Sequence, residues 1–346
     1  MEYRRLGRTG LHVSAIGLGT MTWGRQNTEA EGHEQMDYAI DQGVTFWDTA
    51  EMYAIPPTAE TYGRTEAIIG SWFTSRSKRD KVILATKAVG YAPGFTWVRG
   101  GRARLDHANL AAAVDASLKR LRTDYIDLYQ LHWPDRVTNR FGQRDYVHKP
   151  EADGTPLEET LAALDDLVRA GKIRHLGLSN ETAWGLMTYL KLAETKGLPR
   201  VASIQNAYNL LNRAFENDLA EVTLREGCGL LAYSPLGAGT LSGKYLGGER
   251  PAGTRRAIDH RPSRYETINA DPATNAYIHI ARRHGLDPTQ MAISFVMAQP
   301  FVASALIGAT SMEHLRSNIA AAGIVLNEEV LKEIEAVHAR YPNPCP

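Results

Sequence analysis

The sequence contains very little cysteine. Cys228 and Cys345 are the only two cysteines among 346 residues, and they are far apart along the chain. Two isolated cysteines provide neither a disulfide framework nor the closely spaced thiols of a metal site. We therefore expect a cytoplasmic protein that uses no metal ion.

The chain also lacks net charge and long apolar runs. Its 39 basic residues balance its 39 acidic residues, so the formal net charge is +0. Such a chain has no general electrostatic attraction to nucleic acid or to a membrane. No apolar run is long enough to span a bilayer, and the first residues, MEYRRLGRTGLHVSAIG, lack the apolar core of a signal peptide. We expect no nucleic-acid partner and no membrane partner.

The composition instead favours a globular fold. Hydrophobic residues make up 43% of the chain and charged residues 23%, which provides ample apolar material for a core. Length alone would favour two domains, but β/α barrels often use a chain of this length as one domain.

Short apolar runs alternate with amphipathic helical patterns along the chain. One strand-like run ends at residue 19. The other strand-like runs cover residues 44–50, 81–87, 125–132, 173–180, 201–209, 229–236 and 304–310. Helical patterns cover residues 29–43, 65–76, 109–124, 156–172, 182–197, 215–227 and 311–323. Continuous apolar runs are typical of parallel strands covered on both sides.

About eight βα units predict an α/β fold, a (β/α)8 TIM barrel. Two short strands around the turn RTG predict a β-hairpin at the N-terminus, and residues 327–340 predict an extra C-terminal helix. We expect residues 1–346 to form a single barrel domain. Three long segments, residues 54–62, 134–155 and 237–269, follow strands. We expect them on the side where barrel enzymes bind substrates and cofactors.

Four polar residues stand at or just beyond strand ends. Asp48 and Tyr53 follow VTFW, Lys87 follows VILAT, and His132 follows YIDLYQL. Because the strand ends of a barrel converge on one face, the four side chains should meet in one pocket. An acid, a phenol, an amine and an imidazole gathered there favour proton transfer.

The expected chemistry centres on Tyr53. A pair with Asp48 would keep Lys87 charged inside a dry pocket. A charged lysine favours the phenolate, so we expect the pKa of Tyr53 to lie below its usual value of about 10, as suits a general acid. His132 would bind a substrate oxygen or relay the proton. Taken singly, each of these residues is more often structural, and Lys87 alone would simply reach solvent.

Six segments, in this order, resemble the aldo-keto reductases: FWDTAEMY, LATK, LHW, GLSN, YSPLGAGTLSGKY and LIGATSMEHLRSN. The segments EMYAIPPTAETYGRTE, PAGTRRAI and IARRHGLDPTQMAISFV are most similar to a bacterial branch that contains a tyrosine-auxotrophy suppressor protein and is related to the potassium-channel β subunits. The resemblance implies a barrel that binds NADP(H) without a Rossmann domain. No G-x-G-x-x-G follows the first strand.

The resemblance also implies roles for the four strand-end residues. It makes Tyr53 the proton donor, Lys87 and Asp48 the pair that tunes it, and His132 the group that orients the substrate. In many members glycine follows the catalytic tyrosine directly, but here Ala54 follows Tyr53 and a Tyr-Gly pair occurs later, at Tyr62. The spacing of five residues from Asp48 favours Tyr53, and Tyr62 remains a rival.

The resemblance also implies which residues contact the cofactor. Contacts to the nicotinamide carboxamide are implied for Ser179, Asn180 and Gln205, and stacking on its ring for Tyr233. Ser179 and Asn180 are equally compatible with a helix N-cap. Small residues in SPLGAGTLSGKY let the backbone approach a pyrophosphate. The candidates in this segment are Ser234, Leu236, Gly239 and Lys244.

The last βα unit places Gly308, Thr310 and Ser311 near a helix N-terminus, which is a natural phosphate site, although ordinary capping explains the same pattern. Many relatives carry lysine in place of Gly308 and arginine in place of His314, so the usual 2′-phosphate clamp is missing. The resemblance assigns that role to Arg255. Asn318, one turn beyond His314, suits an adenine contact, and NADP is favoured over NAD.

These residues predict an NADP-dependent oxidoreductase that reduces aldehydes or ketones to alcohols, with a small-molecule carbonyl compound as its partner. Two other functions stay open: a redox-sensing module that binds a protein partner, and a Schiff-base aldolase that uses Lys87. Aromatic pocket walls are expected from Trp23, Trp97 and Trp133, which are equally compatible with packing. The sequence leaves self-association into a homo-oligomer open.

Overall fold

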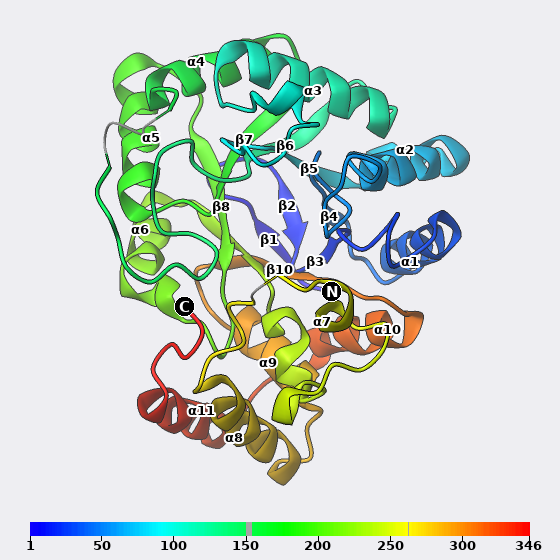
Figure 1. Ribbon diagram of the computed structural model, residues 1–346, viewed down its shortest axis with the longest axis vertical. Helices are drawn as coiled ribbons and strands as arrows, with labels where there is room; N and C mark the ends of the chain where they lie inside the picture. The colour runs from blue at the N-terminus through cyan, green and yellow to red at the C-terminus, as the bar shows by residue number, and fades with distance from the viewer. Residues whose placement is uncertain (150–153, 262) are drawn as a thin grey trace.

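A computed structural model of the protein describes residues 1–149, 154–261 and 263–346 (Figure 1). Residues 150–153 of the predicted segment 134–155, and residue 262 of the segment 237–269, lie outside the described residues. No helix in the described part of the chain is long and apolar enough to cross a membrane.

Eight parallel strands close into a barrel in the order β10-β3-β4-β5-β6-β7-β8-β9. The strands are β3 (Ile16–Gly19), β4 (Phe46–Asp48), β5 (Ile83–Ala88), β6 (Ile126–Leu131), β7 (Ile173–Ser179), β8 (Val201–Ala207), β9 (Gly229–Tyr233) and β10 (Val302–Ile307). The barrel predicted from the alternating pattern is therefore confirmed.

An antiparallel hairpin precedes the barrel. Its strands are β1 (Tyr3–Arg5) and β2 (His12–Ser14). Leu6 and Val13 of this hairpin are fully buried against apolar side chains inside the barrel, among them Phe46 and Leu128. The hairpin thus covers the amino-terminal ends of the strands, and the site must form at the opposite end.

Helices surround the barrel in Figure 1. They are α1 (Glu29–Asp41), α2 (Arg64–Arg76), α3 (His107–Leu121), α4 (Leu157–Arg169), α5 (Ala183–Lys196), α6 (Leu219–Glu226), α7 (Arg255–Ile258), α8 (Ala270–Arg283), α9 (Pro288–Met297), α10 (Met312–Ala320) and α11 (Glu328–Arg340). The extra C-terminal helix, α11, is confirmed.

Local capping sets several of these boundaries. Thr28 caps α1 in a capping box with Glu31. The side chain of Thr182 accepts a hydrogen bond from Gly185 N and caps α5, so the N-cap reading of Ser179 and Asn180 is wrong. Asp218 caps α6. The predicted helix 215–227 therefore divides into a 3-10 turn (Ala214–Asn217) and α6.

The long segments are fastened around the open end of the barrel. The carboxylate of Asp135 accepts hydrogen bonds from Tyr91 N (2.7 Å), Leu105 N (2.8 Å) and Thr155 Oγ1 (3.0 Å). One buried carboxylate thus ties the loop after β5 to both ends of the segment after β6. Between β9 and α8, the segment 237–269 forms two 3-10 turns (Gly237–Ser242 and Leu246–Gly248) and α7.

Candidate active site

The four strand-end side chains come together at the carboxyl end of the barrel. Lys87 Nζ donates hydrogen bonds to Asp48 Oδ2 (2.6 Å) and to the carbonyl oxygen of Thr49 (2.8 Å). The same Nζ lies 3.5 Å from Tyr53 Oη. The Lys87 side chain is 0% exposed and that of Asp48 is 5% exposed. An ion pair therefore forms the floor of the site, with a phenol directly above it.

His132 lies beside Tyr53. The two ring centroids are 5.8 Å apart in an edge-to-face arrangement. The backbone N–H of His132 donates to the carbonyl of Ala88, which ties the end of β6 to β5. Nδ1 of His132 is buried and has no hydrogen-bond partner among the described residues. A buried ring nitrogen without a partner is suited to a bound molecule.

The pKa of Tyr53 does not follow the prediction. Burial raises the pKa of Tyr53 above 10.0, and the charge on Lys87 opposes this shift without overcoming it. The prediction of a lowered pKa was wrong because it counted the neighbouring ammonium and not the loss of water. Burial by itself would lower the pKa of Lys87, but Asp48 and Tyr53 raise it.

His132 is shifted in the opposite direction. Burial, reinforced by the charge of Lys87, holds the pKa of His132 well below 6.5. The imidazole is therefore neutral at neutral pH. It carries one N–H donor and one free acceptor nitrogen.

Tyr62 lies in a different network. Its hydroxyl donates a 2.6 Å hydrogen bond to Glu51 Oε2. Glu51 is fully buried, forms an ion pair with Arg99 (2.7 Å) and accepts a hydrogen bond from Val89 N (2.6 Å). Burial and the Glu51 carboxylate raise the pKa of Tyr62. Tyr62 is thus held as a structural donor, and Tyr53 is the tyrosine beside Lys87.

A residue that the sequence interpretation overlooked completes the floor of the site. Gln130 Nε2 donates to Asp48 Oδ1 (3.0 Å), and Gln205 Nε2 donates to the same oxygen (2.8 Å) and to Gln130 Oε1 (3.0 Å). Both amides are buried. A glutamine within the apolar run YIDLYQL was the available signal, because a buried amide requires hydrogen-bond partners.

The residues assigned to the nicotinamide end are adjacent to this floor. Ser179 Oγ donates to the backbone carbonyl of Gln205 (2.8 Å), and Asn180 Nδ2 donates to that of His132 (2.8 Å). Tyr233 donates its hydroxyl proton to Asn180 Oδ1 (2.8 Å). Gln205 Oε1 accepts no hydrogen bond from any described residue, so it is available to a carboxamide N–H. The polar groups present thus suit a nicotinamide.

The loop after β9 contains residues with left-handed backbone conformations. Ser234 and Gly239 have φ of 55° and 92°, in the left-handed region that favours glycine. A Cβ at Gly239 would lie 3.0 Å from Lys244 Cε, so glycine lets the lysine stem lie close to the backbone. Lys244 is exposed, and Leu236, earlier in the same loop, is half-buried.

The last βα unit offers free backbone donors. Ser311 caps α10 through His314 N (3.2 Å), so the capping interpretation is correct. Among the described residues, the N–H groups of Met312 and Glu313 donate to no acceptor. Asn318 Nδ2 donates to the carbonyl of the exposed Gly308 (3.2 Å), and Thr310 Oγ1 lies 3.4 Å from His314 Nδ1. Free donors at a helix N-terminus suit a phosphate.

Arg255 and Arg256 differ sharply in their surroundings. Arg256 is buried, donates to Thr240 Oγ1 (3.0 Å) and to the carbonyl of Tyr265 (2.9 Å), and is therefore structural. Within the described ranges, the Arg255 side chain has neither a hydrogen bond nor an ion pair. Burial lowers the pKa of Arg255, and Asp259 opposes that shift. A half-buried guanidinium without an anion partner suits a phosphate group.

The three candidate tryptophans divide between core and site. Trp23 is fully buried in the core and donates its indole N–H to Gln35 (2.9 Å), so the pocket-wall interpretation is wrong for it. The ring of Trp133 lies 4.9 Å from that of His132. Trp97 is half-buried and stacks on Phe95.

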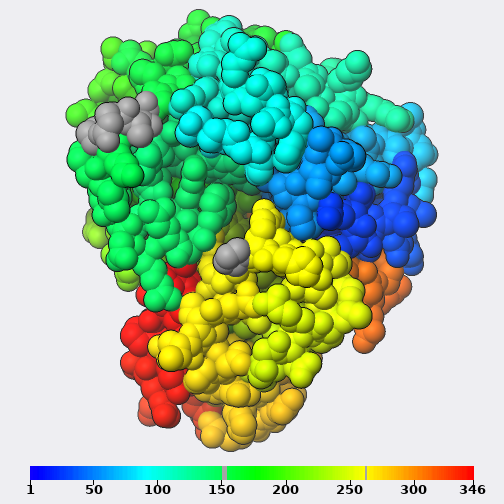
Figure 2. Space-filling view, in the orientation of Figure 1, coloured from blue at the N-terminus to red at the C-terminus, as the bar shows by residue number. Residues whose placement is uncertain are grey.

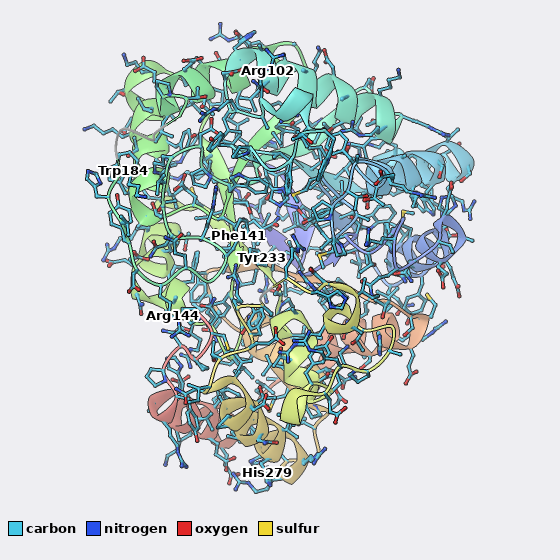
Figure 3. All side chains as sticks on the ribbon, in the orientation of Figure 1. Arg102, Phe141, Arg144, Trp184, Tyr233 and His279 are labelled. Atoms are coloured by element: carbon cyan, nitrogen blue, oxygen red, sulfur yellow. The ribbon has the colours of Figure 1, made fainter. Side chains whose placement is uncertain are left out.

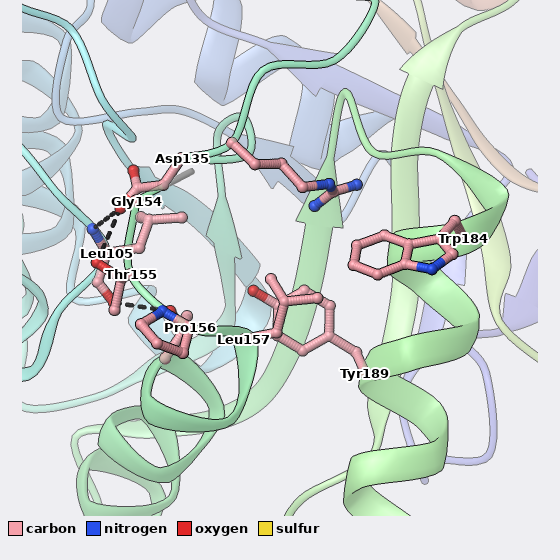
Figure 4. Close-up of a pocket in the computed structure, with 10 residues that line it drawn as sticks. Leu105, Asp135, Gly154, Thr155, Pro156, Leu157, Trp184 and Tyr189 are labelled. Carbon is pink, nitrogen blue, oxygen red and sulfur yellow. Dashed lines mark hydrogen bonds between the residues drawn. The ribbon is translucent and has the colours of Figure 1, made fainter. Parts of the chain in front are cut away.

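A separate cavity of about 280 Å³ lies outside the barrel mouth, between α4, α5 and the segment after β6 (Figure 4). Asp135, Arg136, Trp184 and Tyr189 line it, but none of the four strand-end residues does. Asp135 is bonded as described above, and Arg136 forms an ion pair with Glu181. The polar groups of this cavity therefore hold the segment after β6 in place.

Comparisons with known proteins agree with this architecture. A model of the aldo/keto reductase family matches residues 15–339. The chain is 52% identical over 348 residues to Protein tas of Escherichia coli (strain K12), covering 100% of both chains. It is 34% identical to the uncharacterized oxidoreductase YrpG of Bacillus subtilis, covering 99% of this chain and 97% of the relative. It is also 30% identical to a probable voltage-gated potassium channel subunit beta of Oryza sativa, over 99% and 98% of the two chains.

Proposed function

Because the chain belongs to the aldo/keto reductase family, as its sequence predicted, and is therefore an oxidoreductase, we propose that it reduces aldehydes or ketones to alcohols with NADPH. The observation that carries this proposal is the placement of Lys87 Nζ between Asp48 Oδ2 and Tyr53 Oη. Bound NADPH supplies a hydride to the carbonyl carbon. The protein must then protonate the carbonyl oxygen.

Tyr53 is the proposed proton donor. Its raised pKa keeps the phenol protonated throughout neutral pH, and the alkoxide that forms as the hydride arrives is a stronger base than a phenolate. The ammonium of Lys87 then stabilises the phenolate that remains after transfer. Asp48, held by Lys87, Gln130 and Gln205, keeps the ammonium in position.

His132 is proposed to orient the substrate. Because its imidazole is neutral, a ring N–H can donate to the carbonyl oxygen without adding a second positive charge beside Lys87. Together with Tyr53, it would polarise the carbonyl and stabilise the charge that develops on oxygen.

The cofactor would lie across the strand ends of the barrel. We assign the nicotinamide carboxamide to Ser179, Asn180 and Gln205, and the stacked ring to Tyr233. The pyrophosphate would contact the segment after β9 through Ser234, Leu236, Gly239 and Lys244. The adenosine end would contact Gly308, Thr310, Ser311, His314 and Asn318. Arg255 would hold the 2′-phosphate, so NADP is favoured over NAD.

A Schiff-base aldolase is less well supported. Such an enzyme needs a neutral lysine amine as the nucleophile. Asp48 raises the pKa of Lys87, and the ammonium already donates toward Asp48, Thr49 and Tyr53. Lys87 therefore has no free lone pair for attack at neutral pH.

Two further assignments accompany the proposal. Cys228 and Cys345 are both free, which supports a cytoplasmic location. The apolar side chains of α11, such as Ile334, belong to the same core as the barrel strands, which supports a single domain spanning residues 1–346.

The proposal is tested by fluorescence titration of the purified chain with NADPH and with NADH. The cofactor that binds more tightly is then used with a panel of aldehydes and ketones, and the loss of reduced cofactor is followed. We expect NADPH to bind more tightly and carbonyl compounds to be turned over. Binding without turnover of any carbonyl would instead favour a redox-sensing module, to be tested by recovery of a protein partner.

A further inference from the structure

Two arginines from different segments flank one aromatic ring at the mouth of the site. The guanidinium carbons of Arg140 and Arg264 each lie 6.0 Å from the ring centroid of Phe141. Phe141 is 51% exposed, and Figure 3 shows it close to Tyr233. Arg140 belongs to the segment after β6, and Arg264 to the segment between α7 and α8. Figure 2 shows these segments, green and yellow, facing each other around a hollow in the surface.

Both arginines are connected to the proposed reaction centre. The guanidinium carbon of Arg140 lies 5.7 Å from the ring centroid of Trp133, whose ring lies 4.9 Å from that of His132. Arg264 Nη2 donates to the hydroxyl of Tyr233 (3.3 Å). Tyr233 in turn lies on the nicotinamide side of the site, through its bond to Asn180. The two charges therefore border the space between the barrel mouth and solvent.

Neither guanidinium forms an ion pair with a described residue. In residues 1–149, 154–261 and 263–346, no carboxylate lies within ion-pair distance of Arg140 or Arg264. Among the described residues, the side chain of Arg140 donates a hydrogen bond only to the carbonyl of Pro134 (3.1 Å). Asp135, on the same segment, already accepts three hydrogen bonds. By contrast, Arg136 on the same segment forms an ion pair with Glu181.

Burial also changes the pKa of Arg140. It lowers the pKa of Arg140, and the charge of Asp135 compensates only in part. A guanidinium that has lost water without gaining an anion is stabilised when a carboxylate or phosphate binds it. The exposed ring of Phe141 between the two cations offers an apolar surface for the carbon skeleton of such a molecule.

We propose that Arg140 and Arg264 form a subsite for an anionic group, a carboxylate or a phosphate, on the carbonyl substrate. The subsite selects anionic aldehydes or ketones over neutral ones of the same shape. This inference rests on the proposed carbonyl reduction. The same chemistry would also bind a phosphate of the cofactor, and the experiment below separates the two sources.

The test compares 4-carboxybenzaldehyde with its methyl ester, methyl 4-formylbenzoate, at saturating NADPH. The wild type is expected to have the higher kcat/KM for the acid. Arg140→Gln and Arg264→Gln should each lower the ratio of kcat/KM for acid over ester by about tenfold, as expected for the loss of a charged hydrogen bond. Arg140→Lys, which keeps the charge, should retain part of the preference. Arg144→Gln removes an exposed charge from the same segment and should leave the ratio unchanged.

The dissociation constant for NADPH is measured for each variant. An unchanged acid-to-ester ratio in both glutamine variants overturns the proposal. A weaker NADPH complex with an unchanged ratio also overturns it, and assigns the arginines to the cofactor. Circular dichroism and the thermal midpoint identify a variant that fails to fold. If Arg140→Gln fails to fold, the acid-to-ester ratio of kcat/KM is measured for Arg140→Lys instead.

A chain that does not reduce carbonyl compounds at all would give a different result. If the wild type reduces neither aldehyde, the subsite is tested by calorimetry with 4-(hydroxymethyl)benzoate and its methyl ester on the protein with NADPH added. Tighter binding of the acid, lost in Arg140→Gln, supports the subsite without turnover. Equal binding of acid and ester overturns it.

Discussion

The ammonium of Lys87 donates a 2.6 Å hydrogen bond to Oδ2 of Asp48, and both side chains are buried inside the barrel. Oδ1 of the same carboxylate is held by the amides of Gln130 and Gln205. The pair thus links strands β4 and β5 to β6 and β8. Stability and proton transfer therefore depend on the same contacts.

Breaking this ion pair should be costly. Lys87→Met leaves the Asp48 carboxylate buried without its cation, and we expect a loss of about 3–5 kcal/mol in the free energy of unfolding. Carbonyl reduction should be lost as well. Urea unfolding followed by circular dichroism measures the stability. The double variant Lys87→Met/Asp48→Asn should be less unstable than the sum of the two single losses. Additive losses would show that the two groups are not coupled.

The two neighbouring tyrosines should respond differently to the loss of a hydroxyl. Tyr53→Phe should lower kcat for carbonyl reduction by about 10²-fold or more, because the proton donor is removed, while NADPH still binds. Tyr62→Phe should keep most of the activity. It should reduce stability by about 1–3 kcal/mol, because the buried Glu51 loses a donor. Full activity in Tyr53→Phe, or its loss only in Tyr62→Phe, would reverse the assignment.

Protonation of His132 should make the stability of the fold depend on pH. Its pKa in the folded protein lies well below the usual 6.5, so the unfolded chain binds the proton more readily. Stability is then complete above pH 6.5 and falls as the pH drops toward the folded-state pKa. His132→Gln removes this contribution. The difference between wild-type and variant urea midpoints should therefore change with pH. A constant difference would contradict the prediction.

Arg255 should control the choice of cofactor. Arg255→Ala should weaken NADPH binding by about tenfold or more through the loss of a charged phosphate contact, with NADH binding nearly unchanged. Fluorescence titration with both cofactors measures the ratio. The adjacent Arg256→Ala is the matched control. It should lower the thermal midpoint, because bonds to Thr240 and Tyr265 are lost, and leave the ratio unchanged. If Arg255→Ala weakens the binding of NADPH and of NADH equally, Arg255 does not hold the 2′-phosphate.

Much of the fold was readable from local patterns. Short apolar runs alternating with amphipathic segments identified the barrel strands, and the ends of those runs identified Asp48, Lys87 and His132. Helices α8 and α9 were not assigned as helices from their residues. Helix α9 is buried almost throughout, so it lacks the polar face that marks an amphipathic helix.

The site was readable only in part. The spacing from Asp48 favoured Tyr53 over Tyr62, but the segment between them contains Pro56 and Pro57, and no local rule defines where such a segment directs a side chain. Gln130 went unnoticed because its importance lies in contacts with Asp48 and Gln205, which are far from it in sequence. The difference between Arg255 and Arg256 likewise depends on Thr240 and Tyr265, which no periodicity brings together with them.

The sequence by itself determined the order of the strands and of most helices, the hairpin and the positions of polar residues at strand ends, because these follow from side-chain periodicity and capping along a short stretch of chain. Only the tertiary structure decided which tyrosine lies beside Lys87, and that burial outweighs the lysine charge in the pKa of Tyr53. It also decided that Arg140 and Arg264 meet around Phe141. These properties depend on distances between remote segments and on the exclusion of water, which exist only after the chain has folded.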